Sequence, residues 1–146
     1  MKTVIFDIDG TLADITHRRV YLDETPPNWT KFNAHMGDDL PNTPIVALYK
    51  TLWASEAYNI EIVTGRNEQF RNVTEAWLAW NEIPFKRVTM RADKDYRPDH
   101  LVKKDVLDGF LAEGLEIEFC VDDRQQVVDM WRANDVTCLQ CDIGDF

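Results

Sequence analysis

The sequence contains no long apolar segment, and this absence restricts the kind of protein that it encodes. Along its 146 residues no apolar run approaches the ~20 residues needed to cross a bilayer. We therefore expect no membrane span. The apolar run at the N-terminus meets an acid at Asp7 and is too short for the roughly 7–15-residue core of a secretory signal. We accordingly expect a cytoplasmic protein.

Basic residues are also few. The 16 lysines and arginines are outnumbered by 26 acids, which gives a formal net charge of -10. This balance argues against a broad electrostatic surface for nucleic acid, because such a surface needs clustered lysine and arginine. It does not exclude a local pocket that one end of a strand enters.

Cysteine is scarce as well, since the chain has three. Cys138 and Cys141 have CxxC spacing, but zinc would need a second pair of ligands and a redox pair would normally open a helix after a strand. Thiols of cytosolic proteins are normally reduced. We interpret the two residues as unrelated thiols near a terminal strand.

Five short apolar runs alternate with segments of helical periodicity. The predicted strands are residues 2–8, 59–64, 85–90, 116–121 and 136–140, and the predicted helices are residues 44–57, 67–81, 98–113 and 124–134. Strands that alternate with helices indicate a parallel sheet with helices on both faces. The expected fold is therefore α/β, a three-layer Rossmann-like domain with a central parallel sheet. The chain length fits one domain, residues 1–146.

Residues 14–43 do not fit this alternation. They are rich in proline, asparagine, aspartate and aromatic residues. Connections longer than ~12–15 residues are usually lids, binding loops or disordered segments. Trp29, Phe32 and Met36 recur at helical spacing, which favours a short helix. We therefore expect a lid inserted after the first strand.

Acidic residues follow two of the predicted strands, where open parallel sheets bind their ligands. Asp7 and Asp9 end the first strand, and Asp122 and Asp123 end the fourth. Four carboxylates at one edge would repel one another and be driven toward protonation unless a cation lay among them. Mg²⁺ prefers oxygen ligands and commonly shares carboxylates with a substrate phosphate. The pattern therefore predicts a magnesium site made by Asp7 with Asp122 and Asp123.

The same residues suit phosphoryl transfer. Asp7 is the candidate nucleophile, which would form an aspartyl-phosphate, and Asp9 is the candidate acid that protonates the leaving oxygen and later activates water. The transition state spreads charge over the phosphoryl oxygens and needs donors and cations near them. The candidates for that task are the Thr64 hydroxyl, the exposed backbone N–H groups around Gly10 and Gly65, and either Lys103 or Lys104.

Each of these signals has a simpler explanation when it is taken alone. Acids commonly end strands, adjacent acids can cap a helix, and the glycine after Asp9 can merely mark a turn. The conjunction is more specific, because DxDGT, TGR, a lysine and DD occur in this order on the expected elements. We therefore predict a magnesium-dependent phosphatase.

These motifs resemble the haloacid dehalogenase (HAD) superfamily of phosphohydrolases. A narrower resemblance is to the 3'-phosphatase domain of bacteriophage polynucleotide kinase-phosphatase. It rests on residues 7–13, Arg18, residues 64–66, 97–103 and 122–132, and the terminal Gly144-Asp145-Phe146. The likeness spans nearly the whole chain, although residues 14–43 match only patchily beyond Arg18.

The resemblance implies a role for each matching residue. Asp7 would be the nucleophile and Asp9 the acid–base. Asp99 would support Lys103, which is preferred to Lys104 because it occupies the family's lysine position. Substrate or transition-state phosphate would be bound by Arg18 and Arg66. The implied ligands of Mg²⁺ are Asp7, the backbone carbonyl of Asp9, Asp122 and Asp123.

Three functions are compatible with these residues. The first is removal of a 3'-phosphate, or opening and removal of a 2',3'-cyclic phosphate, at DNA or RNA ends beside a separate kinase or ligase. The terminal base would then stack on an aromatic ring, although Trp29 and Phe32 can equally serve to pack the lid. The ring candidates are Trp29, Phe32, Tyr21 and Tyr96.

The second function is a phosphatase for small molecules such as nucleoside monophosphates, which the acidic net charge favours modestly. The third is a phosphate-binding module without activity, although none of the expected acids, Thr64 or Lys103 has been lost. The sequence contains no G-x-x-x-x-G-K-[ST] motif, the loop that cradles phosphates in the 5'-kinase half of the bacteriophage enzyme. We therefore expect no kinase activity.

Overall fold

Five parallel strands form the centre of the protein. The computed structural model describes residues 1–144 and places β1 (Thr3–Phe6) in the middle of a sheet of order β5-β4-β1-β6-β7. The other strands are β4 (Asn59–Asn67), β5 (Val88–Arg91), β6 (Ile117–Arg124) and β7 (Cys138–Gly144). Every neighbouring pair is parallel, which confirms the expected α/β fold. Asp145 and Phe146, which belong to the terminal resemblance, lie outside the described residues.

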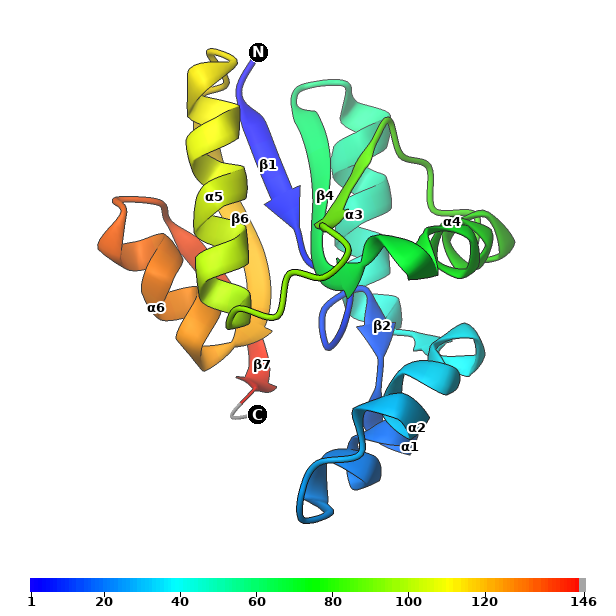
Figure 1. The fold of residues 1–146 in the computed structure, drawn as a ribbon. Helices are drawn as coiled ribbons and strands as arrows, with labels where there is room; N and C mark the ends of the chain where they lie inside the picture. Colours follow the sequence, from blue (N-terminus) through cyan, green and yellow to red (C-terminus); the bar gives the residue numbers. More distant parts are fainter. Residues whose placement is uncertain (145–146) are drawn as a thin grey trace.

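Helices cover both faces of this sheet (Figure 1). One face carries α3 (Thr43–Ser55) and α4 (Arg71–Trp80), and the other carries α5 (Asp99–Ala112) and α6 (Gln125–Ala133). Three layers result, as the alternation of strands and helices predicted.

The alternation of side chains along β1 explains why there are two cores. Val4 and Phe6 belong to the apolar cluster under α3 and α4, whereas Ile5 belongs to the cluster under α5 and α6. Successive residues of a strand point to opposite faces, so a strand buried on both sides is apolar along most of its length. All four residues of β1 are buried, including the polar Thr3.

Several boundaries differ from the predicted ones. Residue 67 was expected to start a helix, but Asn67 ends β4. Its side chain accepts the N–H of Gln69 and so caps the 3₁₀ turn η3 (Glu68–Phe70), which precedes α4. β4 and β7 both run further than expected. In each case the pairing register shifts near the end, between Val63 and Asn67 in one pair of strands and between Asp122 and Arg124 in the other.

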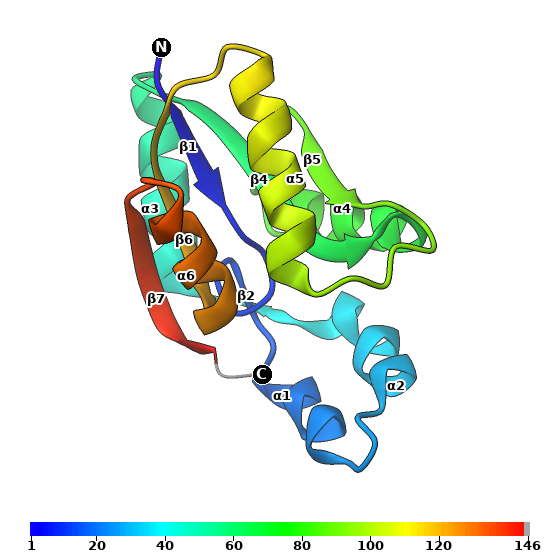
Figure 2. The same ribbon diagram turned by 60° about the vertical axis from the view of Figure 1, so that its left-hand side comes forward.

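Residues 14–43 lie beyond the carboxyl ends of the strands (Figures 1 and 2). Two short strands close the base of this segment, where β2 (Ala13–Asp14) pairs antiparallel with β3 (Leu40–Pro41). Between them lie α1 (Thr16–Arg19), η1 (Val20–Asp23), α2 (Trp29–Ala34) and η2 (Met36–Asp38). The expected short helix is α2, although Met36 belongs to the following turn. That the segment acts as a lid stays a prediction.

Two further expectations concern the cysteines and the membrane. Cys120, Cys138 and Cys141 are free thiols. Cys138 is buried in the cluster under α5 and α6, whereas Cys141 packs against the opposite cluster, so the two CxxC thiols serve different faces of the sheet. Among residues 1–144, no helix is long and apolar enough to span a bilayer.

Candidate active site

The candidate site lies at the carboxyl end of β1, where the order of the strands reverses. Along the chain the sheet grows from β1 to β4 on one side and to β6 on the other. In open α/β sheets this switch point leaves a crevice that receives the ligand. A cavity of about 580 Å³ opens here, and its wall includes Asp7, Asp9 and Asp123.

The loop after β1 is shaped by Gly10. Its φ of 81° is left-handed, a conformation that glycine adopts without steric cost. A Cβ atom at this position would also collide with the carboxylate of Asp123. The Gly10 N–H donates to the carbonyl of Ala13 at 2.9 Å, so this amide closes the loop instead of facing a ligand. The amides of Thr11 and Ala13 likewise donate within the loop, to the carbonyl of Ile8 at 3.0 and 2.9 Å, so a contact between this loop and phosphate stays a prediction.

Asp7 is held by donors on both of its oxygens. Lys103 Nζ lies 2.8 Å from Asp7 Oδ1, and the Thr11 hydroxyl donates to Oδ2 at 3.0 Å. Lys103 is buried and also donates to Asp122 Oδ2 at 2.9 Å. Lys104 instead pairs with Asp108 in an exposed contact. Of the two candidate lysines, the structure thus brings Lys103 to the acids.

Three carboxylates in this cluster face a single lysine. Oxygens of Asp7, Asp122 and Asp123 all lie within 4.8 Å of one another. Burial and the charge of Asp122 raise the pKa of Asp7 well above its ordinary value, and the same two causes raise the pKa of Asp123 to about 6. Burial lowers the pKa of Lys103, but the charges of Asp122 and Asp7 outweigh it and the pKa is raised. Three carboxylates around one lysine thus favour the uptake of a proton or of a cation.

The two acids at the end of β6 are not equivalent. Asp122 accepts from Lys103, from the indole N–H of Trp131 at 3.3 Å and from the backbone N–H of Asp123 at 2.9 Å. Asp123 Oδ1 is buried and has no hydrogen-bond partner among residues 1–144. A buried carboxylate oxygen without a donor is costly unless a cation satisfies it. Among the described acids, this atom is the clearest sign that the cluster suits a metal ion.

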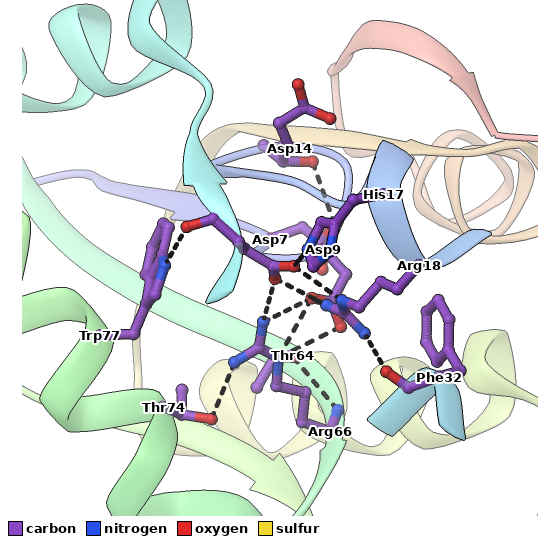
Figure 3. Close-up of polar contacts among 12 residues, drawn as sticks. Asp7, Asp9, Asp14, His17, Arg18, Phe32, Thr64, Arg66, Thr74 and Trp77 are labelled. Carbon is purple, nitrogen blue, oxygen red and sulfur yellow. Dashed lines mark hydrogen bonds and ion pairs between the residues drawn. The ribbon is translucent and has the colours of Figure 1, made fainter. Parts of the chain in front are cut away.

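Asp9 has different surroundings, because two arginines hold it (Figure 3). Arg18 Nη2 and Arg66 Nη2 each lie 2.6 Å from Asp9 Oδ1, and Arg66 Nε lies 3.2 Å from Oδ2. Burial raises the pKa of Asp9, but the charges of Arg66 and Arg18 outweigh it and hold the pKa below its usual range. Asp9 is thus an ionised carboxylate with a fixed orientation.

The two arginines differ in their access to the cavity. Arg66 lines it, and its Nη1 donates to Thr74 at 3.1 Å. Arg18 is 0% exposed, donates to the carbonyl of Phe32 at 3.3 Å and lies over the Phe32 ring, with the guanidinium carbon 4.3 Å from the centroid. In this structure Arg18 holds Asp9 in place. Its contact with phosphate stays a prediction.

The end of β4 brings Thr64 and Gly65 to the same edge. The buried Thr64 hydroxyl accepts the N–H of Arg66 at 3.2 Å. A Cβ atom at Gly65 would collide with the carboxylate of Asp99, so glycine allows α5 to approach the strand. Asp99 Oδ2 lies 3.9 Å from Lys103 Nζ, a separation at which Asp99 acts on the lysine through its charge.

Thr11 and Asp39 are among the residues of this site that were not predicted from the sequence. Thr11 belongs to the DxDGT motif, and its place after the glycine turn was the available signal for its contact with Asp7. Asp39 is buried beside Arg18 and Arg66. It lies in a segment without clear periodicity and follows the exposed Asp38, so no pattern distinguishes it.

Comparison with known proteins identifies the family. The profile of the polynucleotide kinase PNKP phosphatase domain matches residues 1–146. The chain belongs to this family. The resemblance to a HAD phosphatase of the polynucleotide kinase type is therefore confirmed. The family is one of phosphatases, which places the chain among the hydrolases.

Solved structures agree with this assignment. Chains of the Pnkp1/Rnl/Hen1 RNA repair complex and of a second Pnkp1/Rnl/Hen1 structure are each 36% identical to this protein over 99% of its length, with a TM-score of 0.81. The domain covers 43% and 47% of those chains, which is less than half of their length.

More distant structures share only the fold. A HAD-like hydrolase from Streptococcus pneumoniae is 14% identical, with a TM-score of 0.63, over 96% of the phosphatase domain and 84% of its own chain. A second hydrolase from that species is 14% identical, with a TM-score of 0.61, over 95% of the domain and 92% of its own chain.

Proposed function

We propose that the domain is a magnesium-dependent phosphomonoesterase that forms an aspartyl-phosphate on Asp7 and removes 3'-phosphates, or opens and removes 2',3'-cyclic phosphates, at nucleic-acid ends. One observation carries this proposal. Asp7 borders the cavity at the switch point, and both of its oxygens are held, by Lys103 and by Thr11. It belongs to the acid cluster that suits a cation, and it lies near Asp9, the acid that two arginines fix.

The acid cluster supports the choice of Mg²⁺. Asp123 offers a buried oxygen without a donor, whereas both oxygens of Asp122 already accept from the protein. Of these two acids we therefore assign direct contact with the metal to Asp123 and a supporting role to Asp122, while Asp7 and the backbone carbonyl of Asp9 are the further ligands that the family resemblance implies. Bound Mg²⁺ would neutralise charge on the phosphate and orient it against Asp7.

Asp9 is suited to move a proton in both steps. In the first step Asp7 attacks phosphorus while Asp9 gives a proton to the leaving oxygen. In the second step Asp9 takes a proton from the water that hydrolyses the aspartyl-phosphate. The arginines keep Asp9 ionised in the free protein, and the negative charge of an arriving phosphate raises its affinity for a proton. The same acid can thus serve in turn as acid and base.

The wall of the cavity supports a nucleotide end as the substrate. Four arginines and five aspartates contribute to this wall, together with the half-exposed Trp29 and the exposed Tyr96, and a cation in the acid cluster would offset part of the negative charge. Positive groups attract a phosphate backbone, and aromatic faces stack on bases. The four arginines are Arg66, Arg91, Arg97 and Arg124.

The relatives support the same proposal. The name of the matching family refers to polynucleotide kinase, and the relatives at 36% identity are chains of a complex described as an RNA repair complex. We propose that this domain likewise works beside a kinase or a ligase. Both DNA and RNA are included in the test.

The test compares substrates at fixed Mg²⁺. Purified protein is assayed with 3'-phosphorylated DNA and RNA oligonucleotides and with nucleoside 3'- and 5'-monophosphates, and Asp7→Asn serves as the control for contaminating phosphatases. We expect the highest kcat/KM with a 3'-phosphorylated oligonucleotide. Equal or better turnover of the 5'-monophosphate would instead identify a small-molecule phosphatase. No hydrolysis of any monoester would leave a phosphate-binding module.

A further inference from the structure

One buried acid near the site has no part in the chemistry described so far. Asp39 comes from the segment of residues 14–43, and its side chain is 0% exposed. An acid is almost never fully buried unless it is paired. Its position therefore requires partners, and they are residues of the candidate site.

Asp39 binds the two arginines that hold Asp9. Arg18 meets it with two parallel bonds, from Nε to Oδ1 and from Nη2 to Oδ2, both of 2.8 Å. Arg66 Nη2 lies 3.2 Å from Oδ2. His17 Nε2 lies 2.7 Å from Oδ1. Each arginine thus lies between Asp39 on one side and Asp9 on the other.

The charges of this group balance. Arg18 and Arg66 provide two positive charges, and Asp9 and Asp39 provide two negative ones. If Asp39 lost its charge, two buried guanidinium groups would share Asp9 alone. Arg18 would also lose the two parallel bonds that fix the plane of its guanidinium group. The orientation of Asp9 would therefore change, although Asp39 does not touch it.

The backbone of Asp39 is itself anchored. Its carbonyl accepts the indole N–H of Trp77 in α4 at 2.8 Å, and the next residues form β3, which pairs with β2. Thr74, one turn before Trp77 on the same helix, accepts from Arg66 Nη1. The acid and one of its arginines are thus fixed to the same helix of the core.

We propose that Asp39 is a positioning residue, which holds Arg18 and Arg66 in the geometry that lets Asp9 transfer protons. This inference rests on the proposed function. It also gives residues 14–43 a task besides covering the cavity, because the segment contributes both Asp39 and Arg18.

The experiment separates the two steps of the reaction. Asp39→Asn keeps the size of the side chain and removes its charge. With a 3'-phosphorylated oligonucleotide we expect kcat to fall by about ten- to a hundredfold, since acid–base catalysis contributes about 10²–10⁴-fold, while KM changes much less. With p-nitrophenyl phosphate, whose leaving group needs little protonation, the phosphoenzyme should form nearly as fast as in the wild type and then accumulate because its hydrolysis is slow. Rapid acid quench measures both rates.

Two variants accompany it. Asp38→Asn changes the neighbouring exposed acid and should leave both rates unchanged. Asp39→Glu restores the charge with a longer side chain and should recover part of the lost kcat. If Asp39→Asn does not melt cooperatively and is therefore not folded, Asp39→Glu takes its place. The positioning role then predicts that Asp39→Glu slows hydrolysis of the phosphoenzyme more than its formation.

The outcomes distinguish this inference from the proposed function. Wild-type rates in Asp39→Asn, or an equal fall in both steps for both Asp39 variants, would overturn the positioning role while leaving the phosphatase in place. A wild-type protein that hydrolyses no phosphomonoester would refute the proposed function itself.

Discussion

Asp7 and Asp9 are two residues apart, but their surroundings move their pKa values in opposite directions. Burial and neighbouring acids raise the pKa of Asp7, whereas two arginines hold that of Asp9 low despite its burial. Titratable groups whose environments separate their pKa values commonly have separate catalytic roles. A cation in the acid cluster would favour the ionised form of Asp7, as a nucleophile requires. Ionisation of Asp7 and metal binding should therefore be linked.

Removing the charge of Asp7 and removing the charge of Asp9 should have different consequences for the reaction. We expect Asp7→Asn to abolish both turnover and phosphoenzyme formation, because an amide cannot serve as the nucleophile. Asp9→Asn should still form some phosphoenzyme from p-nitrophenyl phosphate, but hydrolysis should fall by about 10²–10⁴-fold. Acid quench and mass spectrometry of the phosphorylated peptide provide the measurement. An active Asp7→Asn protein would refute the assignment of the nucleophile.

Gly10 allows a test with a matched control. Gly10→Ala would place a side chain at a φ of 81° and against the Asp123 carboxylate. Gly114 has a φ of 86°, but a Cβ atom there has open space. Both substitutions should cost about 1–3 kcal/mol of backbone strain. Only Gly10→Ala should also weaken activity and metal binding, because only it displaces Asp123.

Thermal melting and kcat of the two glycine variants give the comparison. Equal retention of activity in both variants would show that the close approach of the loop to Asp123 is not needed for catalysis.

The order of the strands explains why the acids of the site could be predicted from the sequence. Asp7, Asp9, Asp122 and Asp123 each follow an apolar run, and the ends of parallel strands meet at one edge whatever the details of the loops. Lys103 is separable from Lys104 in the structure because only one of the adjacent helix positions faces the sheet. The sequence pattern itself left the choice between the two lysines open, and the lysine position of the family resemblance favoured Lys103.

The rest of the site depends on tertiary contacts that have no local pattern. Asp39 is buried because β3 pairs with β2 and because Trp77 binds its carbonyl from α4. The full burial of Arg18 follows from the same packing, and its motif position alone indicated a phosphate ligand. Periodicity is weakest in residues 14–43, which consist of turns and short helices. That segment is where sequence-based inference was least complete.

Helix α2 provides a prediction about substrate length. Trp29 begins this helix, is 48% exposed and lines the cavity, and its ring makes an edge contact with Phe32 at 5.5 Å. If it stacks on a base, Trp29→Ala should raise KM for a 3'-phosphorylated oligonucleotide by about 5- to 100-fold, since stacking is worth about 1–3 kcal/mol per base. KM for p-nitrophenyl phosphate should not change.

Trp80→Ala is the control for Trp29→Ala. Trp80 is 88% exposed at the end of α4, and it is not among the residues that line the cavity. The control should leave both constants unchanged. A lower melting temperature of Trp29→Ala without any change in KM would show that the ring only packs the segment.

For the whole molecule, the net charge and the charges in the cavity have opposite effects on the binding of nucleic acid. A protein of charge -10 repels a polyanion at long range, while the arginines of the cavity, together with a cation in the acid cluster, would attract a phosphate at contact distance. Binding of a nucleic-acid end should therefore depend on entry into the cavity and not on a surface along the strand.

The acid cluster makes the stability of the whole domain depend on Mg²⁺. An ion that binds only the native state at a concentration of 100 times its Kd adds about 2.7 kcal/mol to the free energy of unfolding. For a domain of this size, that corresponds to a rise of about 5–10 °C in Tm. Asp123→Asn should change both the Tm without metal and the response of the Tm to Mg²⁺. It should raise Tm without metal, because it removes a buried carboxylate charge whose oxygen lacks a donor, and it should lose most of the rise on adding Mg²⁺.

Scanning calorimetry with EDTA and with Mg²⁺ tests this, with the exposed Asp108→Asn as a control that keeps the wild-type response. Asp123→Asn should also lose activity that added Mg²⁺ restores only in part. If Asp123→Asn kept the full Mg²⁺ response and Asp122→Asn lost it, the assignment of the direct ligand would pass to Asp122. If neither substitution reduced the response, Mg²⁺ would be stabilising the protein from outside the acid cluster.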